Sequence, residues 1–187
     1  MNLEIDENLL AELEAQASNY WNISRHTAEF LSILLDGLEA KRVLEIGTSN
    51  GYSGIWFASV LKKREGKLIT IESHAERFKI ATKNFERAGL SLNIKQVLGH
   101  APEIFADEIE IQQGDFDFIF LDATKAEHIK YFDSVLKLIK KGGIIVADNV
   151  LSHWEKMESY AKYVKSKENI DSIILPIGAG LMISKVN

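Results

Sequence analysis

The sequence predicts an α/β protein with a doubly wound, mostly parallel sheet of seven strands that ends in a C-terminal antiparallel hairpin. From residue 41 onward, short β-branched runs alternate with stretches of helical periodicity. The runs VLEI, LITI, FIFL and IIVA are almost continuously apolar, which is typical of strands buried on both faces. Strand–helix alternation with short links indicates right-handed crossovers, and therefore a parallel sheet covered by helices on both faces.

The elements are predicted in a regular order. Leucines at helical spacing predict a leading helix over residues 6–18, and Ser24 is a candidate N-cap for a second helix. Five core strands follow, at RVLEIG, KLITIE, LNIKQV, FDFIFLD and GGIIVAD. Helices are predicted between and after these strands, near residues 51–63, 74–88, 101–110, 125–140 and 153–167.

The last two candidate strands, SIILPI and GLMISKV, are joined by very few residues. Only Gly178, Ala179 and Gly180 lie between them. Such a short glycine-containing link is typical of an antiparallel hairpin. The parallel sheet is therefore expected to end in one reversed strand.

We expect a single domain that spans residues 1–187, with helices over residues 1–40 and the α/β core over residues 41–187. A chain of 187 residues fits one sizeable hydrophobic core. Its 46% of apolar and 26% of charged residues are typical of a soluble globular protein. The 22 basic and 27 acidic residues leave a net charge of −5, which gives no overall basic field for duplex nucleic acid or an anionic membrane.

The chain contains no cysteine, which excludes disulfides, thiolate nucleophiles and thiolate-bound metal centres. Its N-terminus is acidic and amphipathic, whereas a secretory signal has a basic start before an apolar run. No apolar stretch approaches the roughly 20 residues that span a bilayer. A cytoplasmic protein without a membrane partner is therefore expected.

A glycine turn follows the first core strand, in VLEIGTSNGYSG over residues 43–54. Gly47 and Gly51 let the backbone approach a ligand without a β-carbon, and the next helix presents free N–H groups to an anion. Two glycines alone could also be simple turn residues. Glu72, at the tip of the second strand, favours a ligand because its carboxylate can accept from both hydroxyls of a ribose. Together these features predict a nucleoside cofactor.

The spacing of the glycines indicates which cofactor this is. The dinucleotide fingerprint is G-x-G-x-x-G, but here three residues separate Gly47 from Gly51. This wider turn, with Glu45 just before it, favours a cofactor that ends in an amino acid with one carboxylate and one ammonium group. NAD, and with it a nicotinamide-dependent oxidoreductase, is the weaker alternative.

Oxygen-bearing side chains follow the fourth and fifth core strands. Asp122 ends FDFIFLD with Lys125 three residues later, and Asp148 and Asn149 end GGIIVADN. In a parallel sheet these ends are neighbours, so two carboxylates and an amide oxygen would suit Mg²⁺ or another divalent cation. The alternative is that each Asp caps the following helix. Beside a metal-bound hydroxyl, a neutral Lys125 could remove the proton.

Several ordered motifs resemble one enzyme family. VLEIGTSNGYS, ITIE, FIFLDATK, KKGGIIVADNVL and LPIGAGLMIS together resemble the catechol and caffeoyl-coenzyme-A type of S-adenosylmethionine-dependent O-methyltransferases. The likeness runs from about residue 20 to the C-terminus. It implies a Rossmann-like class I methyltransferase fold, S-adenosylmethionine as the cofactor, and a homodimer for which the amphipathic N-terminal helix is the candidate contact.

The resemblance also implies roles for individual residues. Ser49 and Ser53 would lie at the methionine part of the cofactor, Glu72 at its ribose, and residues 99–101 around its adenine. With Glu45 from the glycine turn, the expected cofactor-binding residues are Ile23, Glu45, Gly47, Ser49, Ser53, Glu72, Gly99, His100, Ala101 and Asp122. The metal ligands would be Asp122, Asp148 and Asn149, and Lys125 would be the catalytic lysine.

Two departures from the family pattern leave the acceptor open. Relatives usually read IGDGL where this chain has IGAGL, so Ala179 replaces a carboxylate, and the segment after Leu151 is shorter than usual. A catechol-like small molecule with a metal-chelated hydroxyl is the expected acceptor. A hydroxylated tRNA base is the alternative, and it would require a basic patch beside the cleft. A protein that binds the cofactor without performing chemistry is a further alternative.

Overall fold

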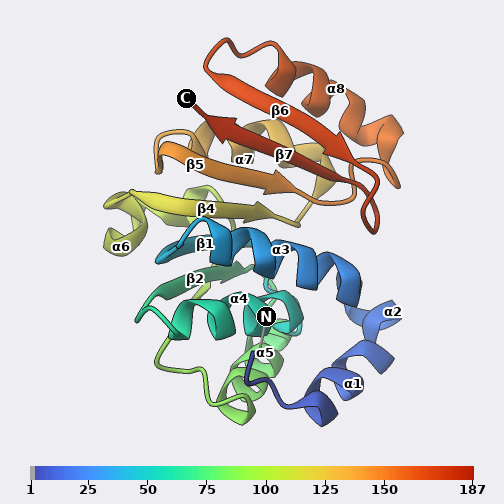
Figure 1. Cartoon of the computed structure of the whole chain (residues 1–187), viewed down its shortest axis with the longest axis vertical. Helices are drawn as coiled ribbons and strands as arrows, with labels where there is room; N and C mark the ends of the chain where they lie inside the picture. The colour runs from blue at the N-terminus through green and yellow to red at the C-terminus, as the bar shows by residue number, and fades with distance from the viewer. Residues whose placement is uncertain (1–2) are drawn as a thin grey trace.

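The computed structural model describes residues 3–187 and contains a seven-stranded sheet in the order β3-β2-β1-β4-β5-β7-β6 (Figure 1). The strands β1 to β5 pair in parallel, and β7 runs antiparallel to both β5 and β6. The bounds are β1 Arg42–Ile46, β2 Lys67–Glu72, β3 Ile94–Leu98, β4 Phe116–Leu121, β5 Ile139–Ala147, β6 Ile170–Leu175 and β7 Leu181–Val186. The predicted fold class, with its single reversed strand, is confirmed.

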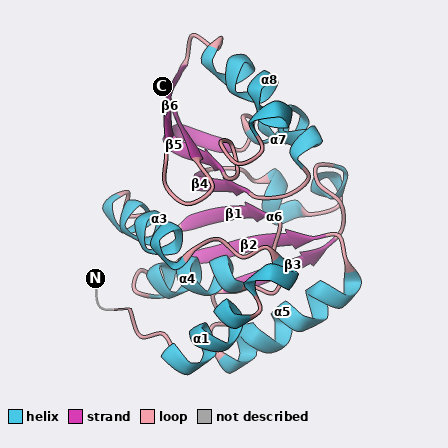
Figure 2. Cartoon of the chain, turned by 90° about the vertical axis from the view of Figure 1, so that its right-hand side faces the viewer, coloured by secondary structure: helices cyan, strands magenta, loops and turns pink. Residues whose placement is uncertain are grey.

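Helices pack on both faces of this sheet (Figure 2). On one face, α3 and α4 bury apolar side chains against β1 and β4, and on the other face α7 and α8 do so against β4, β5 and β7. The bounds are α1 Glu7–Ala15, α2 Ala17–Tyr20, α3 Arg25–Gly37, α4 Tyr52–Lys62, α5 Ala75–Arg87, α6 Ile109–Gln112, α7 His128–Val135 and α8 Trp154–Lys165, with 3-10 turns η1 Glu103–Ala106 and η2 Lys125–Glu127. Within the described residues, no helix is long and apolar enough to cross a membrane.

The N-terminal helices follow the prediction with one difference. Ser24 caps α3, because its hydroxyl accepts a hydrogen bond from the Thr27 N–H at 3.1 Å. The leading helix expected over residues 6–18 ends earlier, at Ala15, because Gln16 has φ −97° and ψ 4° and so leaves the helical range. The chain then continues in the short helix α2.

Two predicted helices are wrong in extent. The helix expected over residues 101–110 is divided into η1 and α6. The helix expected over residues 125–140 ends at Val135, and β5 already begins at Ile139, which pairs with Phe116 of β4. Gly142, with φ +80°, lies where the register of the two strands shifts. Pairing with β4 therefore outweighs the helical periodicity of this lysine-rich segment.

The sheet order brings the predicted site segments together. Ile46 at the end of β1 pairs with Ile71 of β2 and with Leu121 of β4, and Leu121 in turn pairs with Ala147 of β5. The segments that follow these four strands therefore leave the sheet side by side. The helix after β1 covers one face and the helix after β4 covers the other, so a crevice opens between β1 and β4, where ligands of such sheets bind.

Candidate functional site

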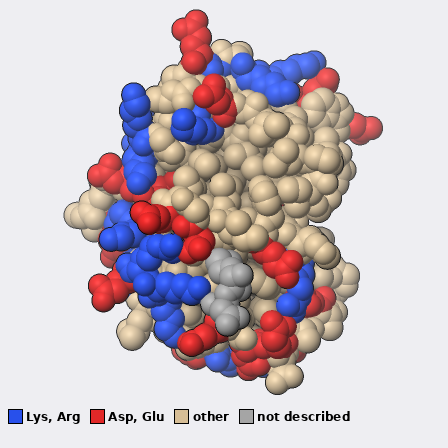
Figure 3. All heavy atoms as spheres, in the orientation of Figure 1, with Lys and Arg blue, Asp and Glu red and all other residues tan. Residues whose placement is uncertain are grey.

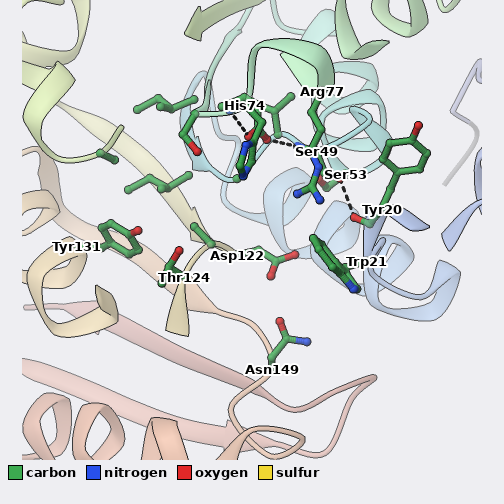
Figure 4. Close-up of a pocket in the computed structure, with 18 of the residues that line it drawn as sticks. Tyr20, Trp21, Ser49, Ser53, His74, Arg77, Asp122, Thr124, Tyr131 and Asn149 are labelled. Carbon is green, nitrogen blue, oxygen red and sulfur yellow. Dashed lines mark hydrogen bonds between the residues drawn. The ribbon is translucent and has the colours of Figure 1, made fainter. Parts of the chain in front are cut away.

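A cavity of about 390 Å³ lies over the carboxyl ends of β1, β2 and β4 (Figure 4). This volume is within the usual range for a site that binds a small molecule or cofactor. Nine of the ten predicted cofactor residues line it: Ile23, Gly47, Ser49, Ser53, Glu72, Gly99, His100, Ala101 and Asp122. Asp122, Lys125 and Asn149 line the same cavity. The two groups of residues found in the sequence therefore face one space.

Gly47 is required by the tertiary structure as well as by its backbone conformation. Its φ is +108°, and a β-carbon at this position would lie 2.1 Å from the carbonyl oxygen of Asp122. The glycine turn after β1 therefore passes directly against the end of β4. Gly51, with φ +88°, is the N-cap of α4, whose N-terminal turn faces the cavity through Tyr52 and Ser53.

Two backbone N–H groups hold the carboxylate of Glu72 in place. Its Oε2 accepts from the Ser49 N–H at 2.8 Å, and its Oε1 accepts from the His74 N–H at 2.9 Å. The side chain is only 5% exposed, yet it lines the cavity. Because each carboxylate oxygen has more than one lone pair, Glu72 can still accept hydrogen bonds from a vicinal diol.

Glu45 lies behind the cavity wall and is not among the residues that line it. It is fully buried and accepts hydrogen bonds from the hydroxyls of Ser53 and Thr70. Burial raises the pKa of Glu45 to about 7. The structure therefore differs from the expectation of a direct contact with a cofactor, since Glu45 instead positions Ser53 at the start of α4.

Asp122 and Lys125 form an ion pair at the end of β4. The Lys125 Nζ donates to the Asp122 Oδ1 at 2.9 Å, and both side chains are mostly buried. Asn149 has φ +63°, and Figure 4 shows its amide facing Asp122 from the end of β5. The helix-capping alternative fails for both aspartates, because η2 and α8 have Thr124 and His153 as their N-cap residues.

Asp148 lies just behind this pair and does not itself line the cavity. Its N–H donates to the Leu121 carbonyl at 3.1 Å, which places it beside the end of β4. The side chain is 3% exposed, and its Oδ1 is buried without a hydrogen-bond partner. Burial, and next the charge of Asp122, raise the pKa of Asp148 well above its usual range.

The residues present fit a divalent cation. A buried carboxylate oxygen without a partner, close to a second carboxylate and an amide oxygen, is an arrangement that a hard cation relieves. This set differs from a site built from three or more His, Cys, Asp or Glu side chains, of which the described part of the chain has none, because its third ligand is an asparagine amide. The protein would therefore offer two carboxylates and one amide oxygen, and water or acceptor oxygens would complete the coordination.

One contact that borders the cavity is not predicted by the sequence. Trp21 has the left-handed φ of 55°, and the Arg77 guanidinium lies 4.5 Å from the centre of its ring. The hydroxyl of Ser49 also donates to the Tyr20 carbonyl at 2.6 Å, so the segment after α2 is tied to the glycine turn. Figure 4 shows Arg77 and Trp21 together at one side of the cavity. No sequence signal distinguishes Arg77 from an ordinary helix-surface arginine.

The glycine turn, the acidic residue at the tip of β2 and the crevice between β1 and β4 define an α/β protein of the class that binds a nucleoside cofactor. Within this class, the chain belongs to the O-methyltransferase family, whose model matches residues 3–185. The family expected from the sequence motifs is confirmed.

Individual relatives support the same assignment. The chain is 40% identical over 144 residues to a catechol O-methyltransferase of Niastella koreensis, covering 77% of this chain and 63% of the relative. It is 33% identical over 129 residues to a catechol O-methyltransferase of Mycobacterium tuberculosis, covering 69% and 57%. The matches therefore span about six-tenths of the length of these two relatives. The structure of a Bacillus cereus O-methyltransferase in complex with SAH superposes with a TM-score of 0.86 at 28% identity, covering 99% of this chain and 93% of that one.

Proposed function

We propose that the chain is an S-adenosylmethionine-dependent O-methyltransferase that acts on a hydroxyl of a catechol-like small molecule in the presence of Mg²⁺ or another divalent cation. The observation that carries this proposal is the single cavity lined both by the glycine turn with Glu72 and by Asp122, Lys125 and Asn149. A methyl donor and an acceptor can meet only where the two sets of residues share one space.

The cofactor would lie along the ends of β1 to β4. S-adenosylmethionine supplies a methyl group that is already activated on a sulfonium. Glu72, fixed by two backbone N–H groups, accepts from the ribose hydroxyls. The backbone N–H groups of the N-terminal turn of α4, beside Ser53, receive the carboxylate, because the hydroxyls of Ser49 and Ser53 already donate to Tyr20 and Glu45. Gly99, His100 and Ala101 line the part of the cavity beyond β2 and would surround the adenine.

The cation would be held by Asp122, Asp148 and Asn149, where it supplies charge stabilisation for an acceptor oxyanion. Lys125 lines the cavity next to Asp122, and its Nζ receives the proton of the acceptor hydroxyl. The Lys125 Nζ now donates to the Asp122 Oδ1 at 2.9 Å, so this hydrogen bond must open before the nitrogen can turn to the acceptor hydroxyl. Asn149 orients the acceptor from the end of β5, where its amide faces Asp122.

The charges around the cavity favour a small acceptor over tRNA. The lysine and arginine side chains that line the cavity are Arg77 and Lys125, and Lys125 is paired with Asp122. On the face drawn in Figure 3, lysines and arginines gather at the edge where β1 and β2 begin, opposite to the cavity. Binding of an RNA backbone requires a basic surface beside the reacting site.

The role of Lys125 is tested by Lys125→Met. We expect kcat for methyl transfer to fall by about 10²- to 10⁴-fold, because the variant lacks the group that accepts the proton. The affinity for S-adenosylmethionine, measured by calorimetry, should stay close to the wild-type value. Methyl transfer by the wild type and the variant is measured with methyl-labelled cofactor and catechol, a caffeoyl thioester or total tRNA as the acceptor, each with Mg²⁺ and with EDTA.

Lys137→Met is the matched control, because Lys137 is an exposed lysine of the segment between α7 and β5. Transfer to tRNA alone would replace the proposed acceptor by the RNA alternative. Wild-type turnover by Lys125→Met would refute the role of the lysine, and full turnover in EDTA would refute the role of the cation. Cofactor binding with no transfer to any of the three would support a protein that binds without chemistry.

We further propose that the chain forms a homodimer through an open face of its sheet. The expected contact, the N-terminal helix, is not available, since Leu9, Leu10 and Leu13 of α1 are already buried in the core. The strands β5, β7 and β6 carry α7 and α8 on one side. On the other side the core reaches Val146 of β5 and Leu181 of β7, but Figure 1 draws no helix of the described residues over the rest of β7 and β6, and this surface is the open face. Ile173 of β6, which pairs with Ile183 of β7, is 55% exposed there.

The open face carries one acidic and one basic position, Asp171 and Lys185, which pair across β6 and β7, and it is otherwise mostly uncharged where Figure 3 shows it, so two copies could meet on it without strong repulsion between like charges. We expect sedimentation to show a wild-type dimer and an Ile173→Lys monomer with unchanged thermal stability. Leu92→Lys is the control, because Leu92 is 86% exposed beside β3, at the opposite edge of the sheet. A wild-type monomer, or a dimer that persists in Ile173→Lys, would exclude this interface.

A further inference from the structure

His128, the first residue of α7, is a polar side chain with no solvent exposure. Its ring lies edge-on to two buried tyrosines, with centroid distances of 5.8 Å to Tyr131 and 5.4 Å to Tyr160. Burial, and next the charge of Lys125, lower the pKa of His128 to about 4. The imidazole is therefore neutral at the pH of an enzyme assay, and the aromatic rings around it hold its orientation.

The hydrogen bond of His128 determines which ring nitrogen carries the proton. Nδ1 lies 3.2 Å from the carbonyl oxygen of Thr124, and Nε2 is buried without a partner. A carbonyl oxygen can only accept, so Nδ1 must be the protonated nitrogen of the neutral ring. A buried acceptor without a partner, as Nε2 is, lowers stability. What the imidazole adds, compared with an apolar side chain, is the hydrogen bond from Nδ1 to the Thr124 carbonyl.

The carbonyl that His128 holds begins the turn that carries the proposed catalytic lysine. The Thr124 carbonyl also accepts from the Glu127 N–H at 3.0 Å, which closes the 3-10 turn η2 around Lys125. At the other end of this turn, the Tyr131 hydroxyl donates to the Glu127 carboxylate at 2.8 Å. Side chains of α7 therefore hold both ends of the turn, His128 at Thr124 and Tyr131 at Glu127. The lysine between them donates to Asp122 at the cavity.

We propose that His128 is a positioning residue, whose Nδ1–H fixes the Thr124 carbonyl and thereby keeps Lys125 beside Asp122 in the geometry that methyl transfer needs. This inference rests on the proposed function of Lys125. A reacting group on a displaced turn loses its alignment even when every reacting group is still present, and a misplacement of about 1 Å can lower a rate by about 100-fold. His128 would act on turnover without touching the cofactor or the acceptor.

Two amide substitutions separate this role from simple packing. The side-chain N–H of His128→Asn can occupy the place of Nδ1, whereas that of His128→Gln reaches the place of Nε2. Both variants lose the aromatic ring, so we expect them to have similar melting temperatures. We expect kcat of His128→Gln to fall by up to about 100-fold relative to His128→Asn, with the KM values for acceptor and cofactor little changed.

Two measurements that do not depend on activity complete the test. Nitrogen-15 NMR of the wild-type protein should show His128 as the neutral tautomer protonated at Nδ1. Hydrogen exchange of the Glu127 amide should be faster in His128→Gln than in His128→Asn, because the turn that it closes is no longer held. A tautomer protonated at Nε2, or equal kcat and equal exchange in the two variants, would overturn the proposal.

Failure of the His128 proposal can be distinguished from failure of the proposed function. If Lys125→Met is inactive and the two His128 variants turn over equally, His128 is only a packing residue and the role of Lys125 stands. If Lys125→Met is fully active, the lysine is not the proton acceptor, and a kcat difference between the His128 variants would then show that the turn positions another group. The tautomer and the amide exchange are measured independently of both results.

Discussion

Asp148→Asn should give a protein that is more stable than the wild type in the absence of metal and yet inactive. The Asp148 carboxylate is buried, its Oδ1 has no partner, and burial and the nearby charge of Asp122 raise its pKa. An amide of the same shape removes the charge and with it the repulsion. We expect a gain in the free energy of unfolding on the order of 1–3 kcal/mol at pH 8 in EDTA, together with loss of methyl transfer.

The stability difference between the wild type and Asp148→Asn should depend on pH, in a direction set by the raised pKa of Asp148. A carboxyl group whose pKa is higher in the folded than in the unfolded chain stabilises the folded state at low pH, and this contribution is lost as the pH rises through the folded pKa. The wild type and Asp148→Asn should therefore have similar stability near pH 4, and the gain of the variant should grow towards pH 8. Urea denaturation in EDTA at several pH values measures this difference.

Asp117→Asn is the matched control, because it should shift stability in the opposite direction. Burial alone would raise the pKa of Asp117, but Lys140 and the N–H groups of Arg42 and Lys41 lower it. Both N–H groups donate to its Oδ2 at 2.7 Å, at the end of the sheet opposite to the cavity. Asp117→Asn should thus be less stable but active. Full activity of Asp148→Asn, or a stability below that of the wild type in EDTA, would contradict the assignment of Asp148.

Gly47→Ala should disrupt both the fold around β1 and the cofactor site. The added β-carbon would lie 2.1 Å from the Asp122 carbonyl oxygen and 2.8 Å from its carbonyl carbon, and the φ of +108° is itself unfavourable for alanine. Backbone atoms cannot move aside as a flexible side chain can. We expect a loss of more than about 3 kcal/mol in the free energy of unfolding, and no measurable binding of S-adenosylmethionine by calorimetry.

Gly89→Ala separates the steric clash from the conformational strain. Gly89 also has a positive φ, of +65°, but no atom lies within 4 Å of the position of its β-carbon. Its substitution should lower the free energy of unfolding by about 1–2 kcal/mol and leave cofactor binding intact. If Gly47→Ala lost no more stability than Gly89→Ala, the close approach of the glycine turn to β4 would not matter.

The strands and the fold class could be predicted because their signal is local. Runs such as FIFL and IIVA are apolar at every position, and this pattern is expected only where a strand is covered on both faces. The helical spacing of apolar residues predicts a helix over the first part of the segment from Leu136 to Gly143, where the structure has the end of α7 and the start of β5. Its conformation depends on β4, which lies beside it only after folding, so periodicity within the segment could not decide it.

The candidate site shows the same division. Gly47, Glu72, Asp122 and Asn149 are predictable because each lies at or just after the end of a recognisable strand, and such positions converge at one edge of a parallel sheet. The residues Trp21 and Arg77 follow no such rule and meet only because α2 and α5 lie beside the same cavity. No sequence pattern identifies His128 either, because it becomes buried only through the packing of α7 against α8.

The order of apolar runs, glycines and strand-end acids was sufficient by itself to determine the α/β class, the family and most of the residues that face the cavity. Only the tertiary structure decided that Glu45 and Asp148 lie behind the cavity wall, that the apolar side of the leading helix is already buried, and that one side of β6 and β7 carries no helix. The physical reason is that periodicity and strand-end position are properties of a short segment. Burial, pKa and hydrogen-bond partners instead depend on which distant segments pack against it.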